Sequence, residues 1–182
     1  MGLSTRIIRN KEGDKMETNE SNLIKGADIR NDKELLNKLP IPLAGLCKVW
    51  VKRQELEIIL QRLQLNFDEI YEELVKKGDY YCIFVGCRDC LKRRLQEHVN
   101  GPIDKSSFFR SLSGILENSL NSFIDNLYFE CIDENDFDGT RKDEKNSLLS
   151  SGKFYVLNIN ENPHKLAKKI KPILTKYRKI AK

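Results

Sequence analysis

Hydrophobic and polar residues alternate along the chain with two different periods, which separate predicted strands from predicted helices. Three short runs rich in β-branched and aromatic residues predict strands at 46–51, at 80–85 and within NLYFECI at 126–132. Apolar residues at helical spacing predict helices at 54–77 with a break near Asn66, 90–99, 108–120, 136–150 and 163–182. This order predicts an α/β domain with a small three-stranded sheet flanked by helices and a helical insertion between the first two strands.

The two ends of the chain differ in composition from its centre. Residues 1–38 contain scattered polar residues and few large apolar ones, so we predict a mobile arm that buries nothing. The predicted domain covers 39–162, with 54–77 as its helical insertion, and a basic helix follows at 163–182. No apolar run approaches the roughly 20 residues that span a bilayer, and the polar N-terminus lacks a signal-peptide core. We therefore expect a cytoplasmic protein without a membrane segment; the sequence leaves its oligomeric state open.

The positive charge of the chain is concentrated in the predicted C-terminal helix. Residues 163–182 contain seven lysines, one arginine and no acid, which leaves −3 for the rest of a chain whose net charge is +5. Apolar residues recur here at helical spacing, and Pro172 predicts a kink. Such a helix is suited to packing one face on the domain and turning its cations to a nucleic acid, through Lys168, Lys169, Lys176 and Arg178. A merely solvated basic face and attachment to a membrane surface are the alternatives.

Five cysteines in a chain without an export signal indicate reduced thiols. Cys87 and Cys90 form a CxxC pair, and a zinc site would need two further ligands from Cys82, Cys131 or His98. The simpler interpretation is that Cys82 and Cys131 are small core residues on strands, while Cys87 and Cys90 occupy a strand-to-helix turn. We prefer this interpretation to a zinc site.

The stretch YYCIFVGCRDCLKRRLQEH places a basic helix directly after a strand and a glycine. Arg94 and His98 are four residues apart and therefore share one helix face, which we expect to differ from the buried stripe of Leu91 and Leu95. A guanidinium beside an imidazole suits a phosphodiester site, because the first stabilises phosphate charge and the second relays protons. Gly86 would allow a sharp turn beside the substrate. A solvated basic helix is the alternative.

The order of these motifs resembles the GIY-YIG nuclease superfamily over roughly 39–163. Phe84-Val85-Gly86 stands where the family's YIG motif falls, and LKRRLQEH follows at the family's spacing. DKSSFFRSL and LYFECI are similar to the next helix and the third strand. RKDEKNSLL and the extended KFYVLN are similar to the last two conserved segments. Each segment is short, but all occur in the family's order.

The resemblance implies specific roles for these residues. Arg94 would be the catalytic arginine, Glu144 the carboxylate that holds one Mg²⁺ or Mn²⁺, and Asn158 the family's terminal asparagine. The signature tyrosines are replaced by Cys47 and Phe84, which removes the hydroxyls that orient or deprotonate water. Water activation would then depend on His98, Lys105 or Tyr80, with further contacts to nucleic acid from Lys92, Arg93 and Arg110.

Two functions follow from the resemblance. The first is a divalent-metal-dependent endonuclease, a hydrolase that cleaves phosphodiester bonds, with DNA as the expected substrate. The second is a catalytically impaired nucleic-acid-binding module on the same fold, because fold alone does not fix function. The insertion at 54–77 is either a protein-interaction element or simple packing on the sheet.

Overall fold

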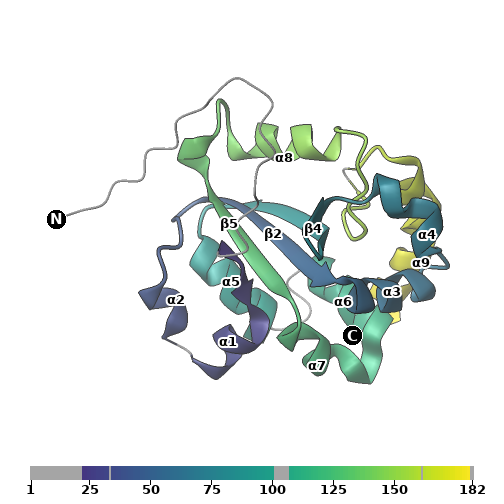
Figure 1. Ribbon diagram of the computed structural model, residues 1–182, viewed down its shortest axis with the longest axis horizontal. Coiled ribbons are helices and arrows are strands. Elements are labelled where there is room, and N and C mark those ends of the chain that lie inside the picture. Colours follow the sequence, from purple (N-terminus) through teal and green to yellow (C-terminus); the bar gives the residue numbers. More distant parts are fainter. Residues whose placement is uncertain (1–21, 33, 101–106, 161, 181–182) are drawn as a thin grey trace.

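The computed structural model describes residues 22–32, 34–100, 107–160 and 162–180, and its centre is a five-stranded antiparallel sheet (Figure 1). The strand order is β1-β5-β2-β4-β3. Their bounds are β1 Ile24–Lys25, β2 Gly45–Lys52, β3 Lys76–Lys77, β4 Tyr80–Arg88 and β5 Tyr128–Asp133. The prediction of an α/β domain is confirmed, and its three strands correspond to β2, β4 and β5. The prediction of only three strands is wrong, because β1 and β3 are two-residue edge strands too short to show periodicity.

Helices surround this sheet. Their bounds are α1 Gly26–Asn31, α2 Leu35–Lys38, α3 Arg53–Arg62, α4 Phe67–Ile70, α5 Leu91–Asn100, α6 Ser107–Leu116, α7 Leu120–Asp125, α8 Arg141–Leu149 and α9 Lys165–Ile180. Short 3₁₀ helices lie at η2 Tyr71–Glu73, η4 Glu117–Ser119 and η5 Glu134–Asp136. None of the helices described is long and apolar enough to cross a bilayer.

Three predicted helices differ from the observed ones for local reasons. The second half of the predicted insertion 54–77 is α4, η2 and β3 rather than one helix. The helix predicted at 108–120 is interrupted at Glu117, whose φ of 47° lies in the left-handed region. The helix predicted from 136 begins at Arg141 instead, because Thr140 and Asp143 form a reciprocal capping box there.

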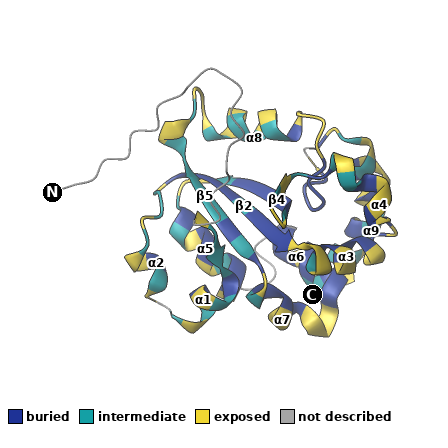
Figure 2. Cartoon of the chain, viewed as in Figure 1, coloured by how far each residue is buried: buried dark blue, intermediate teal, exposed yellow. Residues whose placement is uncertain are grey.

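The two faces of the sheet bury two different clusters. The larger cluster joins β2, β4 and β5 to α1, α3, α5, α6, α7 and α9, while the smaller one lies under α8. Figure 2 shows the central strands buried and the outward surfaces of the surrounding helices exposed. The helix α8 lies apart from the others, along the top of the view in Figure 1. The molecule therefore has a helical layer on each side of its sheet.

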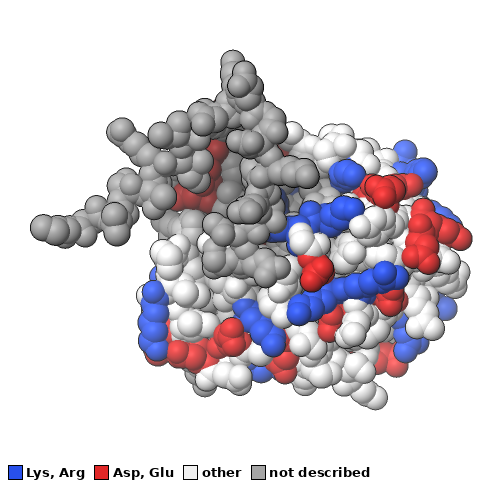
Figure 3. Space-filling view, viewed as in Figure 1, with Lys and Arg blue, Asp and Glu red and all other residues white. Residues whose placement is uncertain are grey.

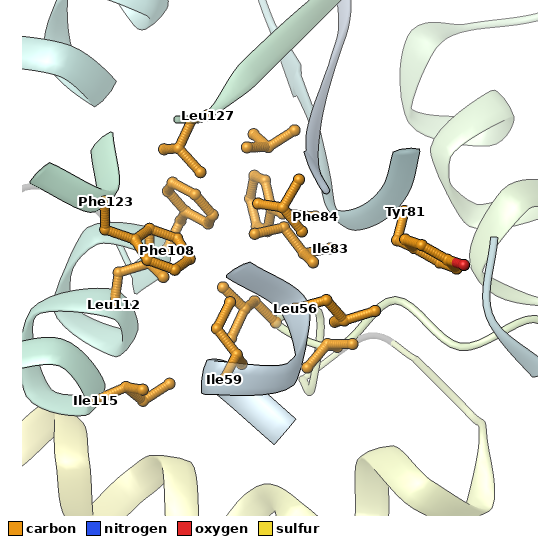
Figure 4. Close-up of a cluster of buried hydrophobic side chains, with 14 of the residues drawn as sticks. Leu56, Ile59, Tyr81, Ile83, Phe84, Phe108, Leu112, Ile115, Phe123 and Leu127 are labelled. Carbon is orange, nitrogen blue, oxygen red and sulfur yellow. The ribbon is translucent and has the colours of Figure 1, made fainter. Parts of the chain in front are cut away.

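A bulge in β4 decides which side chains face the larger cluster. The β2–β4 register shifts between Val49 and Trp50, which leaves Ile83 without a partner on β2. Because of this extra residue, both Ile83 and Phe84 belong to the larger cluster. Figure 4 shows them together with Leu56 of α3 and Phe108 of α6. From Phe84 onward, every second residue of β4 therefore points to the side of the sheet that holds the larger cluster.

The predicted mobile arm is wrong for the part of 1–38 that the structure describes. Ile29 and Leu36 are only 2% and 1% exposed and join the larger cluster, and β1 pairs with β5. Gly26 packs so tightly that a Cβ there would lie 2.1 Å from the carbonyl oxygen of Ile124. A few isolated apolar residues are enough to anchor this segment, although they form no periodic pattern. The rest of the predicted arm, 1–21, lies outside the described residues.

The C-terminal helix α9 is an integral part of the domain. Ala167, Ile170 and Leu174 are fully buried, which confirms the predicted apolar stripe. Pro172 lies inside the helix. At the crossing with α6, a Cβ on Gly114 would lie 2.2 Å from the carbonyl oxygen of Tyr177. The two helices thus approach each other as closely as their backbones allow.

We predict that Gly114→Ala destabilises the protein by about 3 kcal/mol, because overpacking at a backbone contact outweighs the gain in helix propensity. The matched control is Gly139→Ala, where the new Cβ would meet its nearest neighbour at an ordinary 3.6 Å. Urea unfolding followed by Trp50 fluorescence measures both. Equal midpoints for the two variants would contradict the close α6–α9 crossing.

Candidate functional site

The outer edge of β4 is closed by a side chain instead of a strand. The β3 strand pairs only with Tyr80 and Tyr81, at the start of β4. Further along, Leu157 N–H donates to the Ile83 carbonyl at 2.8 Å. The Asn158 amide then accepts from Val85 N–H at 2.7 Å and donates to the Val85 carbonyl at 2.9 Å. Asn158 therefore takes the place of a neighbouring strand and fixes the following residues beside β4.

A pocket of about 190 Å³ lies at this edge. Its lining comes from β4, α8, α9 and the segment after Leu157, and consists of Phe84, Gly86, Arg88, Lys145, Leu157, Asn158, Ile159, Asn160 and Arg178. Three of these side chains are cations, and no carboxylate belongs to the lining within the part of the chain that the structure describes. The pocket therefore favours an anion.

Four predicted site residues line this pocket, namely Phe84, Gly86, Asn158 and Arg178. Gly86 permits close packing there, because a Cβ would lie 3.0 Å from Cε1 of the Phe84 ring. Phe84 is 7% exposed and contributes only its phenyl ring.

Two cations of the pocket donate to neutral partners. Arg178 Nε donates to Ser111 Oγ at 2.7 Å, and Arg88 Nη1 donates to the Cys87 carbonyl at 2.7 Å. Burial, and then the nearby charge of Arg110, lower the pKa of Arg178. Arg178 was among the predicted nucleic-acid contacts, whereas Arg88 and Lys145 were missed. Arg88 could have been found, because it is two residues after Gly86 and therefore on the same face of the strand.

Arg94 does not line this pocket. Its side chain is nearly buried and forms an ion pair with Glu97, Nη1 to Oε2, at 3.1 Å. Burial lowers the pKa of Arg94, and the nearby charge of Arg88 lowers it further. Arg94 thus contributes positive charge behind the pocket wall, and its predicted role as the catalytic arginine stays a prediction.

His98 is a core residue. It is 0% exposed, and its ring lies 4.9 Å from Phe108 and 6.1 Å from Phe129, centroid to centroid. Neither ring nitrogen has a hydrogen-bond partner, and burial lowers the pKa of His98 well below its ordinary value. The prediction that His98 is presented to a phosphate is therefore wrong. Leu91, Arg94, Leu95, His98 and Val99 all belong to one buried face of α5, at the i, i+3, i+4, i+7, i+8 spacing of a core helix.

Glu144 is half-exposed on α8, and the residue of this helix that lines the pocket is its neighbour Lys145. Consecutive helical residues point about 100° apart, so Glu144 and Lys145 do not both face the pocket. Where the resemblance places a metal-holding carboxylate, the pocket has an ammonium group. The described residues contain no group of three or more His, Cys, Asp or Glu arranged to hold a metal. The described lining of the pocket thus offers no carboxylate for a divalent ion, and the predicted role of Glu144 as a metal ligand stays a prediction.

Cys47 and Tyr80, two other groups considered for water activation, are also unsuited to it. Cys47 pairs with Gly86 across the strands, but its hydrogen bond with Cys131 and its burial raise the pKa of its thiol well above the ordinary value. Tyr80 lies at the opposite end of β4, where its ring contacts that of Tyr128 at 4.8 Å. Lys105 lies outside the described residues.

The cysteines form no recognisable zinc site in the described chain. Cys82 is buried as predicted, donates to the Phe84 carbonyl at 3.4 Å, and has a pKa raised by burial to about 12. Cys87, Cys90 and Cys131 are half-buried. This agrees with the interpretation that Cys82 is a small core residue.

The remaining predicted nucleic-acid contacts lie at the surface. Lys168, Lys169, Lys176 and Arg110 are exposed, and Lys92 is half-buried. Arg93 is exposed and pairs with Glu97 at 3.6 Å. On the face seen in Figure 3, Lys and Arg are interspersed with Asp and Glu.

The chain matches no known family model, and comparisons with curated proteins and with solved structures also gave no match.

We predict that His98 makes stability fall in mild acid. The unfolded His98 takes up a proton below its ordinary pKa of about 6.5, whereas the folded one does not, so unfolding is favoured as the pH falls. The loss reaches about 1.4 kcal/mol per pH unit below that value. Between pH 7 and pH 5, the free energy of unfolding should therefore fall by about 2 kcal/mol less in His98→Leu than in the parent protein.

Urea unfolding at a series of pH values measures this difference. The control is His164→Gln. Burial lowers the pKa of His164, but the nearby charge of Glu73 opposes this effect. That variant should change the pH dependence less than His98→Leu does. Parallel curves for the parent and His98→Leu would show that His98 is accessible to protons in the folded protein.

Proposed function

We propose that the protein is a nucleic-acid-binding module on a GIY-YIG-like domain whose catalytic groups are impaired. The observation that carries this proposal is the composition of the pocket at β4. Phe84, Gly86 and Asn158 line it together with Arg88, Lys145 and Arg178, and no described lining residue is a carboxylate. A pocket of this kind attracts phosphate and repels a divalent cation.

The candidate bases among the described residues support binding over cleavage, because none of them is suitable. Hydrolysis needs a group within hydrogen-bond reach of the attacking water. Phe84 has no hydroxyl, Cys47 is buried with a raised pKa, and His98 is enclosed by phenyl rings. None of the three meets this requirement.

The outward face of α9 supplies additional charge. Its buried stripe docks on α6 and turns Lys168, Lys169 and Lys176 to solvent. Arg178 is on the same helix and reaches the pocket. One helix thus joins a diffuse electrostatic surface to a defined site, which suits a strand of nucleic acid that runs along α9.

An endonuclease that uses Mg²⁺ or Mn²⁺ is the second candidate function, because three residues implied by the resemblance do line one pocket. In this case Glu144 would hold the metal after a rearrangement of α8, and Arg94 would act on the phosphate.

The binding proposal predicts a change in salt dependence. In Lys168→Gln/Lys176→Gln, the slope of log K against log salt should become less steep by about 1.8 for duplex DNA, since each lost phosphate contact changes it by about 0.9. The matched control Lys25→Gln/Lys38→Gln removes the same charge at β1 and α2 and should leave the slope unchanged. Fluorescence anisotropy with labelled single- and double-stranded DNA and RNA, between about 50 and 200 mM salt, gives the slopes.

No binding to any of these oligonucleotides would contradict the proposed function. Equal slopes for the α9 variant and its control would remove α9 from the interface.

We further predict that the protein does not cleave these oligonucleotides when Mg²⁺ or Mn²⁺ is added. Cleavage that Glu144→Gln abolishes would establish the endonuclease instead, because this substitution keeps the shape of the side chain and removes the charge that binds metal. The control is Glu134→Gln. Glu134 pairs with Arg141 of α8 at 2.7 Å, so this variant shows whether loss of any carboxylate near α8 abolishes cleavage.

A further inference from the structure

We infer that the pocket beside β4 binds the terminal phosphate of a nucleic-acid strand, without a metal ion. This inference rests on the proposed function and assigns a chemical group to its most specific feature. The assignment comes from the charge, size and hydrogen-bonding capacity of the pocket.

The charge of the pocket matches a terminal phosphate better than a phosphodiester. Arg88, Lys145 and Arg178 converge on it from β4, α8 and α9. A phosphodiester carries one negative charge, whereas a phosphate monoester carries about −1.5 to −2 at neutral pH. Three cations in one small pocket therefore favour the monoester.

The volume of the pocket agrees with this choice. At about 190 Å³ it is several times larger than the roughly 30 Å³ that one water occupies, so a phosphate group enters with room for bound water.

The pocket also offers fixed donors. Ser111 holds the Arg178 guanidinium through Nε, which leaves its other N–H groups for other acceptors. The Arg88 guanidinium is held at the strand edge by the Cys87 carbonyl. Positioned guanidinium donors form strong hydrogen bonds to phosphate oxygens.

A positive residue on α8 takes the place of a metal. A divalent ion would bring positive charge to the phosphate but would itself need carboxylates. The Lys145 ammonium supplies charge directly. Binding should therefore persist in the presence of a chelator.

The test compares oligonucleotides of one sequence with 5′-phosphate, 3′-phosphate or hydroxyl ends, by competition anisotropy in EDTA. We expect a phosphorylated end to bind about tenfold more tightly than a hydroxyl end, because it gains several charge-assisted hydrogen bonds. Lys145→Gln should reduce the ratio of the two affinities, phosphorylated end over hydroxyl end, to about one. Lys142→Gln, an exposed lysine on the same helix, is the matched control and should keep the preference.

The outcomes separate the inference from the proposed function. Binding without an end preference, or a preference that survives in both Lys145→Gln and Arg88→Gln, would overturn the inference and leave the proposed function standing. Millimolar inorganic phosphate that abolishes the preference without displacing the strand would support it. If no oligonucleotide binds, the proposed function fails. The pocket assignment is then tested with inorganic phosphate alone. The phosphate should raise the melting temperature of the parent protein and of Lys142→Gln but not that of Lys145→Gln. Any other result overturns the pocket assignment as well.

Discussion

The double hydrogen bond between the Asn158 amide and the Val85 backbone is the interaction on which the site depends. It satisfies both backbone groups of a buried edge residue and needs no additional strand, so the chain after Leu157 is fixed against β4. Without it, Val85 would present an unpaired donor and acceptor at a buried edge, which costs about 1–3 kcal/mol for each group. The same bond positions Asn160 near Arg88 in the pocket lining. The same two hydrogen bonds therefore close the sheet edge and hold one wall of the pocket in place.

A second constraint explains why the helix after Gly86 does not present a catalytic pair. Its face toward the sheet carries Arg94 and His98 among leucines, and both are buried. His98 meets this environment by remaining neutral among aromatic rings, whereas an arginine cannot lose its charge. Arg94 stays compatible with burial through its ion pair with Glu97. Its charge then adds to the field of Arg88 from inside the domain.

The sequence predicted the three long strands, α5, α9 and the buried stripe of α9, because each has a clear period and enough length. It did not predict β1, which depends on pairing with β5 rather than on its own residues. The meeting of Phe84, Gly86 and Asn158 followed from the resemblance, since β4 and the segment after α8 adjoin in that order. Neither the sequence pattern nor the resemblance predicted which way the side chains on α5 and α8 point. A spacing of four places Arg94 and His98 on one face, but only the packing against β2 and β4 shows that this face is the core.

In the proposed function, the α8 residue that lines the pocket is Lys145 and not Glu144, and this difference decides which chemistry the pocket can perform. A metal site concentrates positive charge on an ion that must be held by acids, and the ion then polarises a bond to be broken. Lysine and arginine in the same place attract the same phosphate but polarise it less and activate no water. The phosphate is then bound stably rather than activated. In the proposed function, the phenyl ring of Phe84 leaves the pocket complementary to a bound phosphate but not to a transition state, and this difference separates a binding site from a catalytic one.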